Sequence, residues 1–389
     1  MQKLGILGGT FDPIHEGHIA LARAAIRHGG LDRVILLPMA RPVHREADAS
    51  AADRLAMCRI AVQGEENLLV SQAGMVSGVR YTQDTLSPLK KEFPHARFTL
   101  IIGADKLPTL PYWYEADKLF AQCDFLCFPR RGVSVDAALE KARAAGARVT
   151  LLPEFSTPYS ATMIRTQTAQ YQDAAGLDKN VLCYMANHGL YQTDFLPKLR
   201  GMMNPHRFEH TLGVRSEAVR LAAIHGLPIQ RCALAGLLHD CAKGMNIKDM
   251  RKLAQDEGLA SDESVLSSSA LLHAPVGAFL AKRDFGIRDE EVLSAIRSHT
   301  VGRPQMSRME MCIFVADATE PGREDYEGLK ELRRLADLSL PAAVYRSLQL
   351  TQEYIKKSNR SFDPASLETM AYLKSLMTPE EKRLAAVKE

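Results

Sequence analysis

The chain has 389 residues, more than one ordinary domain needs. Its 49 Lys and Arg side chains nearly balance 46 Asp and Glu side chains, and neither half carries the basic excess that is typical of nucleic-acid-binding proteins. No apolar run could span a membrane, and the first residues begin a strand pattern instead of a signal peptide. The seven cysteines include no Cys-x-x-Cys pair, so we expect a cytoplasmic protein without disulfides or a zinc knuckle.

The first expected strand, Leu4–Leu7, runs into the string Gly-Gly-Thr-Phe-Asp-Pro-Ile-His-Glu-Gly-His (8–18) and a helix over about 16–28. Helix N-termini attract phosphate through free N–H groups, and glycine lets backbone approach a ligand closely. The string matches neither the P-loop nor Gly-x-Gly-x-x-Gly. Because His15 and His18 stand where the helix begins, we predict a nucleotide site at which chemistry occurs on a phosphate.

Strand-like and helix-like segments alternate up to about residue 155. The further expected strands are Val34–Leu37, Leu68–Ser71, Phe98–Ile102, Asp124–Phe128 and Val149–Leu152, and the further helices lie near 51–63, 82–93 and 134–145. This alternation predicts an α/β domain with a doubly wound parallel sheet. Ligands of such sheets bind beyond the carboxyl ends of the strands, which is where the Gly8–Gly9 turn lies.

Four more strings in this half carry polar or aromatic side chains. They are Arg80-Tyr81-Thr82-Gln83-Asp84-Thr85-Leu86, Gly103-Ala104-Asp105 followed by Trp113, Tyr159-Ser160-Ala161-Thr162-Met163-Ile164-Arg165, and Asn187-His188-Gly189-Leu190-Tyr191. Ser160 suits an N-cap, which again directs N–H groups at a phosphate, and Arg165 suits a phosphate partner. Together with the glycine-rich turn, these strings over residues 3–192 resemble the bacterial nicotinate-nucleotide adenylyltransferases of the nucleotidyltransferase superfamily.

The resemblance implies a Rossmann-like fold and adenylyl transfer from ATP to nicotinate mononucleotide, which yields deamido-NAD and pyrophosphate. It implies His15, His18 and Arg165 as catalytic residues, and Mg²⁺ that accompanies the ATP phosphates. The implied ATP-binding residues are Gly8, Gly9, Thr10, Phe11, His15, His18, Gly103, Asp105, Ser160, Thr162 and Arg165. The implied mononucleotide-binding residues are Arg45, Tyr81, Thr85 and Trp113.

The sequence departs from the family's pattern at three places, one of which is the segment before the Tyr-Thr element, where the usual acidic residue is missing around 72–79. The family's Pro-Pro-His-Lys loop is Pro-Val-His-Arg at 42–45, and Arg80 stands where Ser is usual. Arg45 still supplies a cation, with a geometry that differs from that of Lys. The choice between nicotinate and nicotinamide mononucleotide therefore stays open. A pantetheine-phosphate adenylyltransferase is the alternative, and the Tyr-Thr element, Trp113 and the Gly-Leu-Tyr ending disfavour it.

After about Thr193 the apolar spacing is helical and strand alternation is absent. Helical spacing occurs at Leu212–Ile224, Cys232–Leu238, Val276–Lys282 and Glu291–Ser298. The residues expected to separate helical segments are Pro197, Gly201, Pro205, Gly226, Gly236, Gly244 and Pro275. We therefore predict an all-α domain over 194–389 that follows the α/β domain over 1–193.

The helical half contains a candidate metal cluster. Its central string is Leu-Leu-His-Asp-Cys-Ala-Lys (237–243), in which adjacent His239 and Asp240 can reach one metal centre. Further candidate ligands at wide spacing are His210, His273, His299 and Asp317. Imidazole and carboxylate groups suit first-row transition metals, and a shared carboxylate can bridge two ions that activate water together.

The strings around these residues resemble the HD phosphohydrolases, and more narrowly their bacterial branch of symmetrical diadenosine tetraphosphate hydrolases, over about 195–360. The implied ligands are His210, His239, Asp240 and Asp317 for one ion, and Asp240, His273 and His299 for the second. The resemblance implies iron, catalytic roles for Asp240 and Lys243, and Arg323 near the substrate. Two alternatives to this function remain. The domain hydrolyses another nucleotide, or it senses a nucleotide without cleaving it.

The two resemblances together predict a bifunctional cytoplasmic enzyme. Its expected partners are ATP, nicotinate mononucleotide and diadenosine tetraphosphate, with no nucleic acid and no membrane. The sequence leaves the oligomeric state open.

Overall fold

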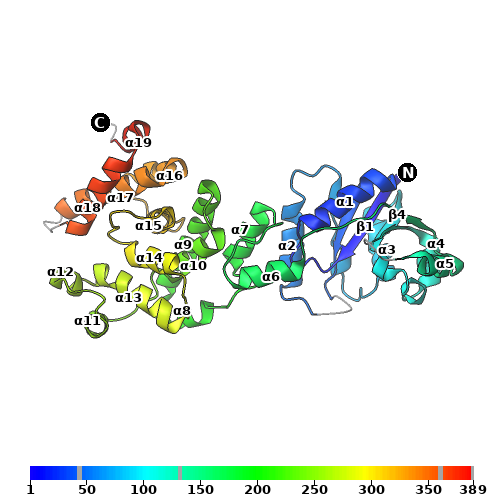
Figure 1. Ribbon diagram of the computed structural model, residues 1–389, viewed down its shortest axis with the longest axis horizontal. Coiled ribbons are helices and arrows are strands. Elements are labelled where there is room, and N and C mark those ends of the chain that lie inside the picture. Colours follow the sequence, from blue (N-terminus) through cyan, green and yellow to red (C-terminus); the bar gives the residue numbers. More distant parts are fainter. Residues whose placement is uncertain (42–45, 130–133, 358–361, 387–389) are drawn as a thin grey trace. The chain divides into compact units, whose positions relative to one another are not determined.

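The computed structural model spans residues 1–389 and describes all of them except 42–45, 130–133, 358–361 and 387–389 (Figure 1). The chain divides into two compact units. The first comprises Met1–Thr168 and Ala174–Tyr184, and the second comprises Ala169–Asp173 and Met185–Glu389. The last crossing from the first unit to the second lies between Tyr184 and Met185, within helix α7 (Lys179–His188). The boundary expected from the sequence pattern was 193/194.

Six parallel strands form the sheet of the first unit, in the order β3-β2-β1-β4-β5-β6. They are β1 (Gln2–Gly9), β2 (Arg33–Pro38), β3 (Leu68–Val70), β4 (Ala96–Gly103), β5 (Cys123–Phe128) and β6 (Val149–Leu151). Each overlaps a strand expected from an apolar run, because a parallel sheet that is covered on both faces buries nearly every side chain. The doubly wound α/β class is confirmed.

The helices of this half are α1 (Glu16–Gly29), α2 (Ala51–Ala61), α3 (Thr82–Glu92), α4 (Ala116–Gln122), α5 (Asp136–Ala144), α6 (Ala161–Ala169) and α7. Leu4 and Ile6 of β1 belong to a buried cluster with Leu86 of α3 and Phe120 of α4. Helices α1 and α2 contact β1 and β2 but contribute nothing to that cluster. The two groups of helices therefore cover opposite faces of the sheet (Figure 1).

The strand order reverses between β1 and β4, because β2 pairs with one side of β1 and β4 pairs with the other. Strand β1 ends at Gly9 and β4 ends at Gly103, so these glycines end neighbouring parallel strands at the same edge of the sheet. Nucleotides bind at such a switch point in doubly wound folds. The topology thus brings the glycine-rich turn and the Gly-Ala-Asp string to one edge.

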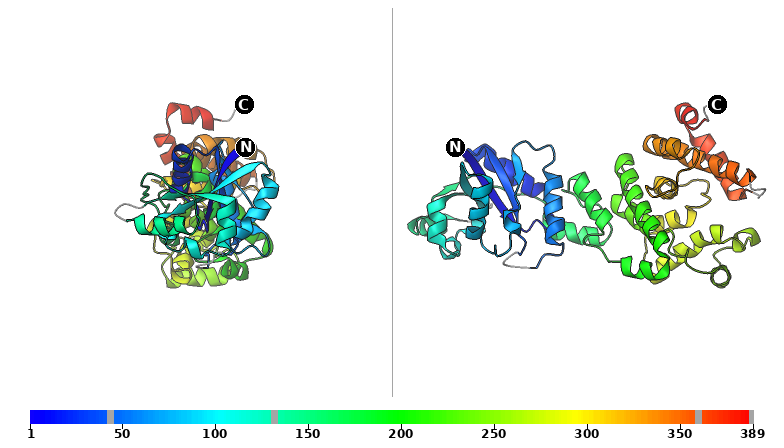
Figure 2. Two further views of the ribbon diagram at one scale, coloured as in Figure 1. Left: turned by 90° about the vertical axis from the view of Figure 1, so that its right-hand side faces the viewer. Right: turned by 180° about the vertical axis from the view of Figure 1, so that it is seen from behind.

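The described part of the second unit contains helices and no strand (Figure 2), which confirms the all-α expectation. The helices that follow α7 are α8 (Leu196–Met202), α9 (Pro205–His225), α10 (Ile229–Leu238), α11 (Ile247–Asp256), α12 (Glu263–Leu266), α13 (Ser269–Asp284), α14 (Glu290–Ser298), α15 (Arg308–Thr319), α16 (Leu329–Leu338), α17 (Leu340–Lys357), α18 (Pro364–Leu376) and α19 (Pro379–Ala385). The four segments with helical spacing lie in or largely within α9, α10, α13 and α14.

Three residues expected to separate helices, Gly201 in α8, Gly236 and Pro275, lie inside helices instead. Gly236 is in α10, where an added Cβ would lie 3.2 Å from the carbonyl oxygen of Val214 in α9. Its small size lets the two helices approach closely, so it is a packing residue. Pro275 lies inside α13 among buried neighbours, whose packing outweighs the cost of one lost backbone hydrogen bond. Pro205 and Gly226, in contrast, begin and cap α9 as expected.

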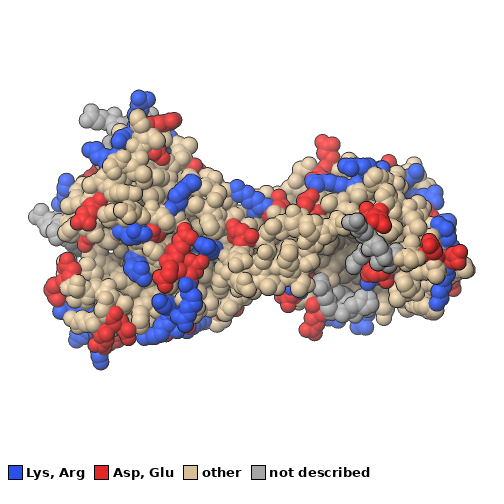
Figure 3. All heavy atoms as spheres, viewed as in Figure 1, with Lys and Arg blue, Asp and Glu red and all other residues tan. Residues whose placement is uncertain are grey.

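Charged side chains of both signs are interspersed over each unit on the face that Figure 3 shows. Within the described ranges, no helix has the length and apolar character that crossing a membrane requires.

Candidate active sites

The glycine-rich turn connects the end of β1 to the start of α1. A Cβ at Gly9 would lie 3.0 Å from the Phe11 ring, so a side chain there would require the ring to shift. Phe11 adopts a left-handed conformation with φ of 50° and is buried, so it folds back beneath the turn. Gly17 has a similar role, since a Cβ would lie 2.8 Å from Thr157 Oγ1 and 2.9 Å from His15 Nδ1. The turn is therefore compact, with neighbouring side chains packed closely against its glycines.

The two histidines of the turn lie side by side at the N-terminus of α1. His15 is the N-cap, and its backbone N–H donates to Nδ1 of His18 over 3.2 Å. The two ring centroids are 3.8 Å apart. Burial lowers the pKa of His15 to about 4, and burial together with the neighbouring His15 lowers that of His18 to about 3. Both imidazoles are therefore neutral at pH 7 without a ligand, next to the free N–H groups of a helix.

Arg165 reaches the same turn from helix α6. Ser160 caps this helix, because its Oγ accepts from the Met163 N–H over 3.2 Å. Arg165 Nη1 donates to the carbonyl oxygen of Asp12 over 2.8 Å, and its Nε lies 2.5 Å from an Asp48 carboxylate oxygen. The structure thus brings Arg165 to the residues just before His15, although 150 residues separate them in sequence.

Arg54 is a further residue of this site that the sequence reading missed. Its guanidinium is buried and donates to the carbonyl oxygens of Thr10, Met39, Ala40 and Ala49, over 2.8 to 3.2 Å. It therefore ties the glycine-rich turn to the loop that follows β2. The sequence offered one signal. Arg54 lies three and four residues before Met57 and Cys58, and therefore on the face of α2 that is otherwise apolar and buried.

The residues expected around the mononucleotide differ in their exposure. Tyr81 is exposed and stacks on Tyr114 with ring centroids 4.7 Å apart. Trp113 is partly buried and packs against the core cluster. Thr85 is fully buried, and its hydroxyl donates to the carbonyl oxygen of Thr82. Arg45 lies outside the described residues.

The remaining expected ATP-binding residues lie on β1, β4 and α6, except Thr10 and Asp105, which lie in the segments that follow β1 and β4. Gly8 is in β1, and an added Cβ there would meet nothing within 4 Å. Gly103 gives space to the Asp105 carboxylate, which would lie 2.5 Å from a Cβ at that position. Thr162 is exposed in the first turn of α6.

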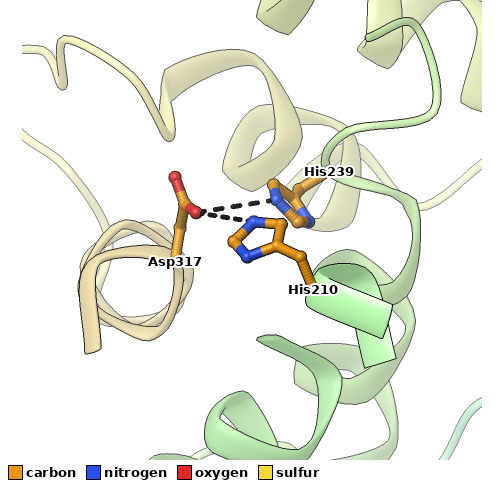
Figure 4. A group of neighbouring side chains, drawn as sticks. All are labelled: His210, His239 and Asp317. Atoms are coloured by element: carbon orange, nitrogen blue, oxygen red, sulfur yellow. Dashed lines mark ion pairs between the residues drawn. The ribbon is translucent and has the colours of Figure 1, made fainter. Parts of the chain in front are cut away.

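In the second unit, six expected metal ligands converge from five helices. His210 lies on α9, His273 on α13 and Asp317 on α15. His239 caps the C-terminus of α10 and precedes Asp240, and His299 caps the C-terminus of α14. Figure 4 shows His210, His239 and Asp317 pointing toward one another.

Asp240 lies between two pairs of histidines. Its Oδ2 is 3.9 Å from His210 Nε2 and 3.6 Å from His239 Nε2. Its Oδ1 is 3.1 Å from His273 Nε2 and 3.7 Å from His299 Nε2. Each carboxylate oxygen thus faces its own pair of imidazoles, as a carboxylate that bridges two ions does.

Asp317 completes the first group, because its Oδ1 lies 3.1 Å from His210 Nε2 and 3.8 Å from His239 Nε2. His239 is completely buried, and its Nε2 has no hydrogen-bond partner. Burial lowers the pKa of His239 to about 4, which keeps the ring in the neutral, metal-ligating form. Burial opposes ionisation of Asp240, but the surrounding histidines lower its pKa, so the carboxylate is charged. This donor set fits a transition-metal ion.

The other ring nitrogen of each histidine is held by the protein. Nδ1 lies 2.8 Å from Gly236 O in His239, 2.7 Å from Ile296 O in His299 and 3.1 Å from Ser269 O in His273. In His210, Nδ1 lies 3.1 Å from Oε1 of the buried Glu320. Such partners fix the tautomer and leave Nε2 for a metal.

Glu320 is the second functional residue that the sequence reading missed. Its carboxylate has room beside α9 because Gly213 lacks a side chain, and an added Cβ would lie 2.4 Å from Glu320 Oε2. The sequence offered one signal, the string Glu-Pro-Gly immediately before Arg323.

Three cations surround the cluster. Arg207 Nη1 lies 2.9 Å from Asp240 Oδ2, and Arg323 Nη2 lies 2.6 Å from Asp317 Oδ1. Lys243 Nζ lies 3.1 Å from Nδ1 of His273, and burial lowers its pKa. All three line a cavity of about 770 Å³ together with Asp240 and Asp317. A polyanion in this cavity would meet cations next to candidate metal ligands.

Comparison with known proteins assigns the two halves of the chain to different families, and each match contains one of the two candidate sites. A family model described as cytidylyltransferase-like matches residues 6–167, and one described as an HD domain matches residues 207–322.

Three curated relatives extend these matches. A Mycoplasma genitalium protein named as a probable nicotinate-nucleotide adenylyltransferase/Ap4A hydrolase is 29% identical over 361 residues, which cover 91% of this chain and 99% of that protein. A symmetrical bis(5′-nucleosyl)-tetraphosphatase from Halalkalibacterium halodurans is 39% identical over 43% of this chain and 88% of its own length. A probable nicotinate-nucleotide adenylyltransferase from Gloeobacter violaceus is 36% identical over 49% of this chain and 96% of its own length.

Proposed function

The chain belongs to two families in succession, the nicotinate-nucleotide adenylyltransferases and the symmetrical bis(5′-nucleosyl)-tetraphosphatases, and on this premise we propose that it catalyses both reactions. We assign the first reaction to residues 1–193 and the second to residues 194–389. The relative from Mycoplasma genitalium, which matches along nearly its whole length and is named for both activities, supports the combination. None of the seven cysteines forms a disulfide, which supports a cytoplasmic location.

The first reaction joins ATP and nicotinate mononucleotide. A phosphate oxygen of the mononucleotide attacks the α-phosphorus of ATP, and the bond from that phosphorus to the leaving pyrophosphate breaks. His15, His18 and Arg165 stabilise the negative charge that accumulates on the leaving group. The observation that carries this assignment is the pair of adjacent imidazoles at the N-terminus of α1, at the switch point of the sheet, with Arg165 bound to the carbonyl oxygen of Asp12 in the same turn.

The substrates lie on either side of this centre. The glycine-rich turn, Gly103, Asp105, Ser160 and Thr162 bind ATP, whose phosphates carry Mg²⁺. Arg45, Tyr81, Thr85 and Trp113 bind the mononucleotide. The exposed face of Tyr81 supports this assignment, because an aromatic ring can stack on a pyridine.

The second reaction hydrolyses diadenosine tetraphosphate. Water adds to a central phosphorus, the anhydride bond between the two halves breaks, and two ADP leave. The carboxylate of Asp240 between two pairs of histidines carries this assignment. His210, His239, Asp240 and Asp317 would hold one ion, and Asp240, His273 and His299 would hold the other. Two bound ions, for which we propose iron, supply an activated water and neutralise phosphate charge. Lys243 and Arg323 contact the phosphates.

Two single variants test the assignment in one product assay. His18→Ala should lose dinucleotide synthesis from ATP and nicotinate mononucleotide while it still cleaves diadenosine tetraphosphate. Asp240→Ala should do the reverse. Full synthesis by His18→Ala would contradict the first site, and loss of both activities in Asp240→Ala would contradict two separate sites. A nucleotide sensor would bind no transition metal, so two ions per purified chain support hydrolysis.

A further inference from the structure

The candidate metal cluster of the second unit opens into two cavities. One, here called the α17 cavity, has a volume of about 770 Å³ and is lined by residues that include Leu350 and Thr351 of α17. The other, here called the α9 cavity, has a volume of about 930 Å³ and is lined by residues that include Leu212 and Ser216 of α9. Arg207, Arg323 and Tyr326 line both cavities.

The metal ligands are divided between the two cavities. Asp240, His273 and His299 line the α17 cavity, whereas His210 lines the α9 cavity. Oδ2 of Asp240, which lines the α17 cavity, lies 3.9 Å from Nε2 of His210, which lines the α9 cavity, so the two cavities adjoin at the cluster. A ligand that crosses the cluster therefore enters both cavities.

The residues at the crossing have the charge of a polyphosphate-binding site. Arg207 and Arg323 have no charged partner except the candidate metal ligands Asp240 and Asp317 among the ion pairs of the described residues. Bound metal would neutralise these carboxylates, and the two guanidinium groups would then be free to pair with phosphate oxygens. They lie where the two cavities meet.

Each cavity has the size and the mixed lining of a nucleoside site. Small-molecule sites span about 300 to 1,000 Å³ and combine apolar walls with a few polar groups. The α17 cavity has Phe314 and Leu350 as apolar walls and the Thr351 hydroxyl. The α9 cavity has Leu212 and Pro321 as apolar residues, the Ser216 hydroxyl and the backbone of Gly213 and Gly322. Its further polar groups include four carboxylates, from Glu209, Glu320, Glu324 and Asp325.

We propose that the α9 cavity binds the second nucleoside of a dinucleoside polyphosphate, while the first occupies the α17 cavity and Arg207 and Arg323 hold the middle phosphates. This inference rests on the proposed hydrolase function and explains its symmetry. When both nucleosides are seated, the central anhydride bond lies at the metal cluster, so each product keeps one nucleoside and two phosphates.

Blocking the α9 cavity should impair the cleavage of substrates with two nucleosides more than that of substrates with one. Adenosine 5′-tetraphosphate has the same four phosphates as diadenosine tetraphosphate but a single nucleoside, which needs only one cavity. Ser216→Trp should therefore lower the ratio of kcat/KM for diadenosine tetraphosphate to that for adenosine tetraphosphate by at least about tenfold, the loss expected when a nucleoside site is blocked. Ile224→Trp is the matched control, because Ile224 is exposed on the same helix and lines neither cavity.

A binding measurement gives a readout without turnover. Equilibrium dialysis with ADP, the product, should find one ADP fewer per chain in the metal-loaded Ser216→Trp protein than in the parent and in Ile224→Trp. An unchanged substrate ratio, together with an unchanged ADP stoichiometry in a folded variant with full metal content, would overturn the second nucleoside site. A parent protein that cleaves no diadenosine tetraphosphate would instead overturn the hydrolase function itself.

Discussion

Oε1 of Glu320 lies 3.1 Å from Nδ1 of His210, on the imidazole nitrogen that does not face Asp317. Both groups are buried, and the Glu320 carboxylate also accepts from the backbone N–H of Gly322. The contact fixes the ring so that Nε2 points into the candidate metal cluster. Glu320 is thus a positioning residue for a metal ligand, supplied by the loop that follows α15.

Removing this carboxylate should weaken metal binding more than it weakens folding. Glu320→Gln should lower the affinity for the ion held by His210 about 10- to 100-fold, the usual effect of losing a partner of a metal-bound histidine. Metal titration of the apoprotein measures this change directly. Glu324→Gln is the control, because Glu324 is exposed in the same loop. Equal affinity in the two variants would mean that Glu320 only supports the loop.

Arg54 should be essential for the shape of the ATP site. Arg54→Met keeps the length of the side chain but leaves the carbonyl oxygens of Thr10, Met39 and Ala40 without a donor. Unsatisfied buried groups cost about 1–3 kcal/mol each, so the first unit should lose at least about 3 kcal/mol of stability. Denaturant unfolding followed by Trp113 fluorescence reports this unit alone, because the chain has a single tryptophan.

Arg59→Met provides the comparison for Arg54, since Arg59 is exposed on the same helix. It should leave the unfolding midpoint nearly unchanged. At a temperature where Arg54→Met is still folded, its KM for ATP should be raised, because the glycine-rich turn is no longer tied to the loop after β2. An ATP KM equal to that of Arg59→Met would limit Arg54 to a stabilising role.

The sequence allowed the six strands, and the six residues that the structure brings together in the candidate metal cluster, to be predicted, because both leave local signals. A buried parallel strand is a short apolar run, and His239-Asp240 is an adjacent pair at a helix end. The signals that Glu320 and Arg54 left were too weak to identify their roles. Glu320 meets its histidine across 110 positions of the chain, and Arg54 binds backbone carbonyls, which every residue has.

The boundary between the units illustrates a second kind of limit. Helix α7 continues from Lys179 to His188, while the chain changes unit after Tyr184. A helical pattern is the same on both sides of that point, because it reports local spacing and not which core the helix contacts. The two cavities of the second unit are likewise invisible in sequence, since their linings combine α9, α15 and α17.

Gly17 should tolerate no side chain. In Gly17→Ala the new methyl group would lie 2.8 Å from Thr157 Oγ1 and 2.9 Å from His15 Nδ1, so the histidine or the loop must move. A displacement of a catalytic group by about 1 Å can cost on the order of 100-fold in rate, and we expect a loss of this size in adenylyl transfer. Initial rates with saturating ATP measure it, and hydrolysis by the second unit should not change.

A second substitution distinguishes a steric effect from a general loss of folding. Thr157→Ala removes the nearer of the two contacts, so the double variant should recover part of the rate that Gly17→Ala loses. If the fold-loss in rate of the double variant equals the product of the fold-losses of the two single variants, the contact with His15, and not the one with Thr157, limits activity.

Acid should destabilise the first unit through the adjacent histidines His15 and His18. Burial lowers the pKa of His15 to about 4, and burial with the neighbouring imidazole lowers that of His18 to about 3, whereas histidine in an unfolded chain has a pKa of about 6.5. Between these values the unfolded chain binds more protons, so stability is complete above pH 6.5 and is lost as the pH falls toward the folded-state pKa values. From pH 7 to pH 5 each histidine should remove about 2 kcal/mol. Unfolding followed by Trp113 fluorescence measures how the free energy of unfolding depends on pH. The slope should be present in the parent and about half as large in His18→Gln. An identical slope in the two proteins would rule out the histidine pair as its source.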